Sequence, residues 1–334
     1  MAKTIRDTDY LAISARIRAM ETELLTGERM EQILTARGEE EVSRVLQDCG
    51  YPGLAGLGQT EMDAALTAVR RDMLADLGEG VPDAGLIDVF KLKYDYHNLK
   101  ALLKAEAVGT DPASMLSDMG RVEAATLRDA LSTGDYGALP PMLAEAAAEA
   151  KAVLETTRDP QLSDILLDRW AFREELALAE ESGSELLAEY VRTRIDGANL
   201  RALVRTLRMG KDGDFLKGVL TEGGDISPEV LLAVAADRGR GLAELYAPTG
   251  FAAAAEAGEK ALKGGPLTEF ERLCDDAAAQ VLDSAAMVPF GDAPLIAYLA
   301  ARETEYTNLR ILLLGRRAGL PADVIRARLR KSLG

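Results

Sequence analysis

A carboxylate and an amide recur at one spacing in three segments of the chain. Each segment has the pattern acid-x-x-Asn-Leu-base-x-Leu-aliphatic. The recurring residues are Asp95, Asn98 and Leu99, then Asp196, Asn199 and Leu200, and then Glu305, Asn308 and Leu309. Carboxylate and amide oxygens are ligands for hard cations, so three copies facing one another would make a ring of carboxylates around a cation or ligand.

Helical spacing places these polar side chains on an apolar face. In the first copy, positions 95, 98, 99, 102 and 103 follow the i, i+3, i+4, i+7, i+8 rule, and the other copies match it. Each polar group left without a hydrogen-bond partner there would cost roughly 1–3 kcal/mol. We therefore expect each pair to hold a neighbouring helix end inside its own unit. The ring is the weaker alternative, because sites about a hundred residues apart need not face one another.

The ends of the three helices that carry this pattern, the signature helices, are also repeated. A glycine lies 11 residues after each asparagine, at a position suited to end a helix: Gly109, Gly210 and Gly319. A residue type that caps helix N-termini lies 15 or 16 residues before each asparagine: Asp83, Ser184 and Asp292. The spacing predicts three helices of about 25 residues each.

The repeat also predicts the organisation of the whole chain. Its asparagines are 101 and 109 positions apart, close to one third of the 334 residues each time. We expect three similar helical units, covering residues 1–111, 112–213 and 214–334. Only 5% of the residues are aromatic and no segment alternates like a strand, so we expect an all-α fold. Apolar spacing further predicts helices over 9–25 and 28–46.

Composition and missing motifs argue against several classes of function. A formal net charge of −16 argues against a nucleic-acid surface, which needs basic residues to meet phosphates. The sequence has no GxxxxGK(S/T) phosphate-binding loop. His97 is the single histidine, which excludes a multi-histidine metal site. We expect no catalytic residue, no cofactor and no bound metal.

The cysteines and apolar runs indicate where the protein works. Cys49 and Cys274 form no CxxC pair or disulfide framework, so we expect two core thiols in a reducing cytoplasm. The N-terminus runs directly into charged residues and lacks the apolar core of a signal peptide. No apolar run approaches the roughly 20 residues that cross a bilayer.

Three stretches together resemble one protein family closely. They are residues 12–21 (Ala-Ile-Ser-Ala-Arg-Ile-Arg-Ala-Met-Glu), residues 93–100 (Lys-Tyr-Asp-Tyr-His-Asn-Leu-Lys) and the C-terminal stretch 306–326. With the threefold signature, they resemble the C subunit of the V-type and A-type ATPases, the counterpart of the d subunit of eukaryotes. The resemblance covers essentially the whole chain. One departure is Gly197, which stands where the other two copies have Tyr96 and Tyr306 and predicts looser packing in the middle unit.

The resemblance implies an architecture and a mechanical role. The fold would be an all-α funnel of three similar units with pseudo-threefold symmetry. The protein would be a non-catalytic rotor part of the central stalk, on the cytoplasmic face of the membrane. It would join the shaft of subunits D and F to the membrane proteolipid ring and so transmit torque for proton or sodium ion transport. The membrane stator subunit is a further candidate partner.

Two other functions fit parts of the sequence. A helical-repeat adaptor would share the repeat and the missing active site, but such repeats usually have periods of roughly 20–50 residues. An enzyme using the buried acids of the signature helices would need a pocket that the sequence does not indicate. The rotor subunit therefore remains the favoured prediction.

Overall fold

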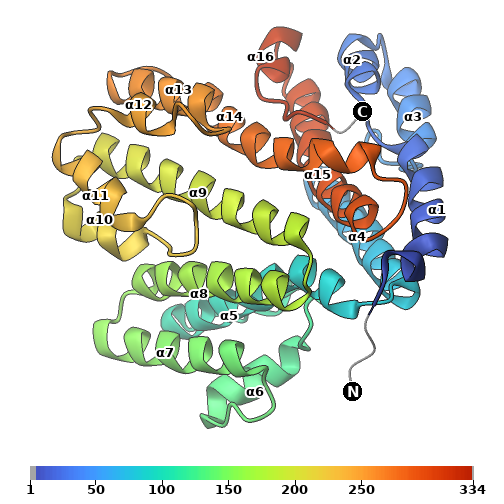
Figure 1. The fold of residues 1–334 in the computed structure, drawn as a ribbon. Coiled ribbons are helices and arrows are strands. Elements are labelled where there is room, and N and C mark those ends of the chain that lie inside the picture. The colour runs from blue at the N-terminus through green and yellow to red at the C-terminus, as the bar shows by residue number, and fades with distance from the viewer. Residues whose placement is uncertain (1–4, 333–334) are drawn as a thin grey trace. The chain divides into compact units, whose positions relative to one another are not determined.

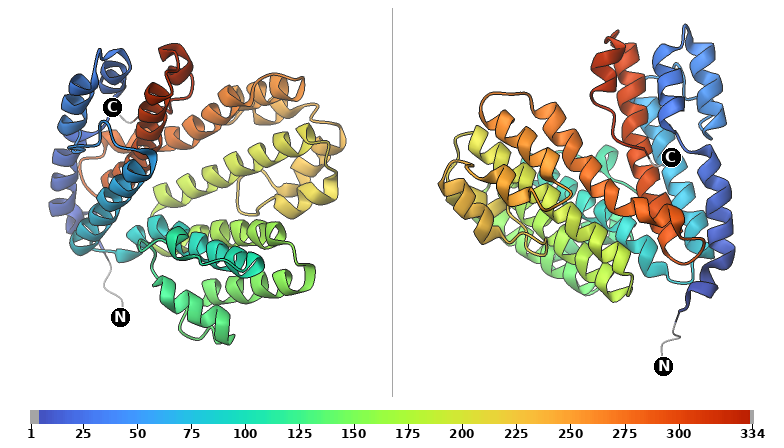
Figure 2. Two further views of the ribbon diagram at one scale, coloured as in Figure 1. Left: turned by 180° about the vertical axis from the view of Figure 1, so that it is seen from behind. Right: turned by 45° about the horizontal axis from the view of Figure 1, so that its top comes forward.

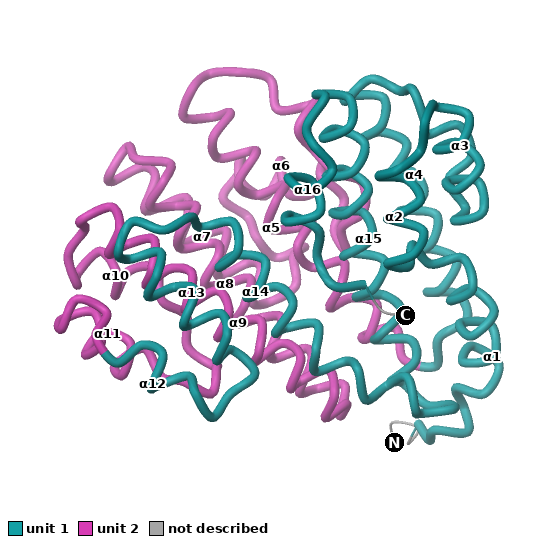
Figure 3. The backbone as a smooth tube through the Cα atoms, turned by 90° about the horizontal axis from the view of Figure 1, so that it is seen from above, with its two compact units in different colours: residues 1–82, 241–334 teal, residues 83–240 magenta. Residues whose placement is uncertain are grey.

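The computed structural model describes residues 5–332, and every regular element among them is a helix (Figure 1). The predicted all-α class is therefore confirmed. The chain divides into two compact units, drawn in two colours in Figure 3: one from Asp83 to Arg240, and one made of the residues up to Pro82 and from Gly241 onward. The three repeat units predicted from the sequence are a different partition and stay a prediction.

The unit from Asp83 to Arg240 contains two signature helices. Its elements are α5 (Ala84–Val108), the 3₁₀ helix η3 (Ala113–Met115), α6 (Ala124–Thr133), α7 (Pro141–Thr157), α8 (Pro160–Glu181), α9 (Glu185–Arg208), α10 (Gly213–Val219) and α11 (Pro228–Ala236). Helix α5 packs against α6, α7 and α8 around a core of leucine and alanine side chains. Ala146, Ala147 and Ala150 of α7 are fully buried in this core, and their small side chains let neighbouring helices approach closely.

The other unit joins both ends of the described chain around the third signature helix. Its elements are η1 (Asp7–Tyr10), α1 (Leu11–Met20), η2 (Glu21–Glu23), α2 (Gly27–Thr35), α3 (Glu39–Asp48), α4 (Gln59–Gly80), α12 (Leu242–Tyr246), α13 (Ala252–Leu262), α14 (Leu267–Gln280), η4 (Val281–Met287), α15 (Ala293–Arg317) and α16 (Ala322–Arg326). Figure 2 shows α15 and α16 beside α2, α3 and α4. Leu309 and Leu312 of α15 share one core with Ile33, Leu46 and Leu66 from the N-terminal helices.

The signature helices begin and end close to the predicted residues. Asp83 and Ser184 cap α5 and α9, accepting hydrogen bonds from the backbone N–H groups of Gly85 and Leu187. The predicted glycines all have left-handed backbones, with φ of 75° at Gly109, 65° at Gly210 and 67° at Gly319.

Asp292 differs from the other two predicted caps, because its side chain makes no capping hydrogen bond. The backbone of Asp292 is itself helical, with φ −74° and ψ −30°. In addition, Pro294 occupies the second helical position and has no N–H to donate. Helix α15 nevertheless starts at Ala293, where the spacing predicts it.

The N-terminal helices are more broken than apolar spacing predicts. The single helix expected over 28–46 is two helices, α2 and α3, because Ala36 leaves the helical region and Gly38 is fully extended. The helix expected over 9–25 is α1 flanked by the short 3₁₀ turns η1 and η2. An apolar stripe can continue through such a break, since both helices still face one core.

Both cysteines are buried and free of disulfide bonds, as predicted. Burial raises the pKa of the Cys49 thiol to about 11. Within residues 5–332, no helix has the length and hydropathy needed to cross a membrane.

Candidate functional site

The three signature asparagines each bind one peptide unit of another segment through two hydrogen bonds. The side-chain Nδ2 donates to a backbone carbonyl and Oδ1 accepts the backbone N–H of the same residue. Asn98 binds Ser117 at 2.8 and 2.8 Å, Asn199 binds Thr221 at 2.7 and 2.9 Å, and Asn308 binds Arg330 at 3.0 and 2.9 Å. We call these three pairs the asparagine clamps. All three asparagine side chains are buried, so water does not compete for these bonds.

The first two signature carboxylates hold the backbone just before the next helix. Asp95 Oδ1 accepts from the N–H groups of Arg121 and Val122 at 2.9 and 3.1 Å, directly before α6. Asp196 accepts from the N–H groups of Asp225 and Ile226 at 3.0 and 3.1 Å, directly before α11. Each signature helix therefore fixes the path of the chain from its own end to the next helix start.

The third carboxylate does the same for the N-terminal segment. Glu305 accepts hydrogen bonds from the N–H of Leu25, directly before α2, and from the hydroxyl of Tyr51, after α3. Arg302, one helical turn earlier, pairs with Glu305 at 2.6 Å. The α2–α3 hairpin is thus attached to α15 at both of its ends.

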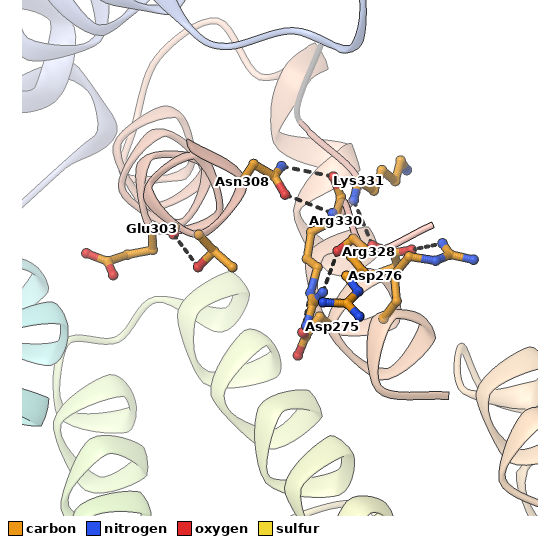
Figure 4. A network of polar contacts seen from close by, with 9 residues as sticks. Asp275, Asp276, Glu303, Asn308, Arg328, Arg330 and Lys331 are labelled. Atoms are coloured by element: carbon orange, nitrogen blue, oxygen red, sulfur yellow. Dashed lines mark hydrogen bonds and ion pairs between the residues drawn. The ribbon is translucent and has the colours of Figure 1, made fainter. Parts of the chain in front are cut away.

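The third asparagine clamp joins a polar network around the C-terminal segment (Figure 4). Asn308 holds the backbone of Arg330, while the Arg330 guanidinium donates to Asp275 of α14 at 2.8 Å. The N–H of Lys331 donates to Asp276 at 2.7 Å. The segment after α16 is therefore fixed to both α15 and α14.

These contacts are of the kind expected if the polar pairs hold neighbouring segments. The carboxylates and amides are satisfied by backbone groups, as expected for residues that hold the fold. Among residues 5–332, no group of three or more His, Cys, Asp and Glu side chains is arranged to hold a metal ion. The partners of the first two copies, however, lie beyond residues 111 and 213, so the pairs bind across the predicted unit boundaries.

The three carboxylates have different electrostatic surroundings. Burial raises the pKa of Asp95 and of Glu305, and the nearby Arg121 and Arg302 oppose the rise. Arg121 donates to Asp95 Oδ2 at 2.6 Å and also pairs with Glu174. Asp196 is buried with backbone donors instead, and burial raises its pKa with an added contribution from the like charge of Asp225.

The sequence contains two further site residues that the signature did not include. A side-chain carbon on Gly120 would lie 2.3 Å from Asp95 Oδ1, and one on Gly224 would lie 2.2 Å from Asp196 Oδ1. Each glycine directly precedes a residue whose N–H the aspartate binds. In the third copy, the longer Glu305 reaches the N–H of Leu25, and Leu24 stands in place of the glycine.

Two regularities in the sequence point to this arrangement. Gly120 and Gly224 follow their aspartates by 25 and 28 residues, so the two glycines stand at similar, though not identical, distances along the chain. In addition, Asn98, Asn199 and Asn308 are the only asparagines in the chain. A residue type found only at three repeated positions indicates a need for its particular pair of donor and acceptor.

Comparisons with known proteins give one consistent family. The profile of the ATP synthase (C/AC39) subunit family matches residues 13–328, which include all three signature asparagines. The chain is 26% identical to the C subunit of the V-type sodium ATPase of Enterococcus hirae, covering 97% of this chain and 98% of that protein. It is 28% identical to the C subunit of the V-type ATP synthase of Thermus thermophilus, covering 94% and 96%. It is 26% identical to the C subunit of the A-type ATP synthase of Halorubrum lacusprofundi, covering 95% and 96%.

The middle clamp provides a test of the clamp geometry. We expect Asn199→Leu to lower the free energy of unfolding by about 1–3 kcal/mol, because it leaves the buried N–H and carbonyl of Thr221 without partners. Urea denaturation of both proteins measures the difference. A change within about 0.5 kcal/mol, the size typical of a surface substitution, would contradict the buried clamp.

The close approach of Gly224 to Asp196 gives a second prediction. We expect Gly224→Ala to destabilise the fold by about 1–3 kcal/mol, because the new methyl group displaces a carboxylate held by two hydrogen bonds. Gly218→Ala is the matched control, since its added carbon meets no atom within 4 Å. Equal melting temperatures for Gly224→Ala and the control would show that Asp196 can move at no cost.

The raised pKa of Asp196 gives a third prediction. The Asp196 carboxyl group holds its proton more tightly in the folded protein than in the unfolded chain, where an Asp has a pKa of about 3.9. The stabilising contribution of Asp196 is therefore complete below that pH and is lost as pH rises through the folded pKa. We expect the unfolding free energy of the natural protein, minus that of Asp196→Asn, to fall between about pH 4 and neutrality. Urea melts across this range measure it, and a constant or rising difference would refute the expectation.

Proposed function

Because the chain belongs to the ATP synthase (C/AC39) subunit family, we propose that it is a non-catalytic rotor subunit in the central stalk of a V/A-type rotary ATPase. The family match over residues 13–328 is the observation that carries this proposal. In this role the protein joins the central shaft of subunits D and F to the proteolipid ring in the membrane. It works on the cytoplasmic membrane face, and the membrane stator subunit is a further candidate partner.

The internal structure of the protein supports a mechanical role. A rotor part must pass torque between a motor and an ion-translocating ring without yielding. Close-packed helices suit this task, because well-packed interiors have low compressibility and transmit strain. The asparagine clamps add to this stiffness by tying the segments between helices to the signature helices, where an unattached loop would yield first.

The repeated clamps also support the pseudo-threefold socket that the resemblance implies. Asn98, Asn199 and Asn308 make the same pair of bonds in each copy. Three equivalent attachments would give a near-round seat for a ring of identical proteolipids. A closed threefold arrangement would also distinguish the rotor subunit from a helical-repeat adaptor, whose repeats form an open superhelix.

The rotor proposal predicts that the isolated protein neither binds nor hydrolyses ATP. In the complex, nucleotide chemistry belongs to other subunits, and this chain has no phosphate-binding loop. Calorimetric titration of the purified full-length chain with ATP and Mg²⁺ measures binding, and phosphate release measures hydrolysis. A saturable ATP site with micromolar affinity would contradict the proposal.

Reconstitution tests the coupling role directly. Vesicles that contain the membrane part of the ATPase from the same organism would be combined with its soluble catalytic part, with and without this chain. We expect ATP hydrolysis in both samples but ATP-driven ion uptake only when the chain is present. Uptake of equal rate in both samples would show that the chain does not couple the two parts. The Gly218→Ala variant, whose added carbon meets no atom within 4 Å, serves as a control and should restore uptake as the natural protein does.

A further inference from the structure

A basic cavity lies between α14, α15 and the C-terminal segment. Its volume is about 620 Å³, and it is lined by Thr268, Glu271, Thr307, Arg310, Ile311, Arg328 and Arg330. We call it the C-terminal basin. Three arginines and a single glutamate in one lining are unusual in a chain whose formal net charge is −16. The lining side chains are therefore basic on balance, and the two acids that pair with them, Asp275 and Asp63, lie outside the lining.

The third asparagine clamp builds one wall of this basin. Asn308 fixes the backbone of Arg330, and Asp275 fixes the Arg330 guanidinium. The Arg330 side chain also donates to the carbonyl of Arg328 at 2.5 Å, which holds the neighbouring backbone (Figure 4). The wall is consequently ordered before any partner arrives, so binding would cost little conformational entropy.

Two of the three guanidinium groups are available to a partner. Within residues 5–332, the exposed side chain of Arg328 has no ion pair or hydrogen bond. Arg310 pairs with Asp63 at 3.4 Å, and both side chains are partly exposed. The pair is long and the Arg310 side chain is about half exposed, so the pair contributes little and a better-placed carboxylate can replace it.

We propose that the C-terminal basin binds a carboxylate-bearing segment of a partner protein. Guanidinium groups bind carboxylates through paired, charge-assisted hydrogen bonds, which makes arginine well suited to this recognition. Ile311 adds an apolar side chain to the lining, which suits a peptide better than a small inorganic anion. The basin would serve any partner with this chemistry, so its test does not depend on the rotor proposal.

Two labelled peptides test the inference on the full-length protein. One carries glutamates at helical spacing between leucines, and the other has glutamines at the same positions. Fluorescence anisotropy at physiological salt measures their binding to the natural protein and to Arg328→Gln, Arg310→Gln and Arg240→Gln. Arg240 is the matched control, because its side chain is 81% exposed and lies outside the basin. Thermal melts check that each variant is folded.

The expected result is selective loss of binding. The glutamate peptide should bind the natural protein and the Arg240→Gln variant equally, and should bind Arg328→Gln and Arg310→Gln about fivefold or more weakly. The glutamine peptide should bind weakly to all four. Equal weakening by all three substitutions would indicate diffuse charge attraction and overturn the inference. Failure of the glutamate peptide to bind, or equal binding of the glutamate and glutamine peptides, would overturn it as well.

Discussion

The structure depends on one repeated interaction, in which a buried asparagine on a long helix binds both polar groups of a single peptide unit. Asn98, Asn199 and Asn308 each hold a segment that has no regular secondary structure at the point of contact. Such a segment cannot satisfy its backbone groups through its own helix, so a buried side chain must do so. Both functions of an amide, donor and acceptor, are used, which neither aspartate nor leucine could reproduce.

The signature carboxylates extend this constraint to the next helix start. Asp95 and Asp196 have short side chains. Their carboxylates lie so close to Gly120 and Gly224 that a side-chain carbon at either glycine would clash. Glu305 is one methylene longer and reaches Leu25 without a glycine. The same task is therefore performed by two matched combinations, aspartate with glycine and glutamate with leucine. The copies also differ in charge compensation, because Arg121 and Arg302 accompany only the first and third carboxylates.

Local sequence rules predict the helices well and the partners of their polar residues poorly. Caps, glycines and the 3.6-residue period depend on neighbouring residues, so the starts and ends of α5, α9 and α15 follow from them. These rules do not predict the break between α2 and α3, because both helices face one core and keep one apolar stripe. The binding of Leu25 and Tyr51 by Glu305 spans about 250 to 280 residues, and no local spacing encodes such a contact.

Hydrogen exchange at the clamped peptide units tests the central role of the asparagine clamps most directly. The backbone N–H groups of Ser117, Thr221 and Arg330 should exchange slowly in the natural protein, because each is bound by a buried asparagine oxygen. In the Asn199→Leu protein under native conditions, we expect faster exchange at Thr221 and its neighbours, with exchange at Ser117 and Arg330 unchanged. Unchanged exchange at Thr221 would show that Asn199 does not hold this segment and would contradict the account.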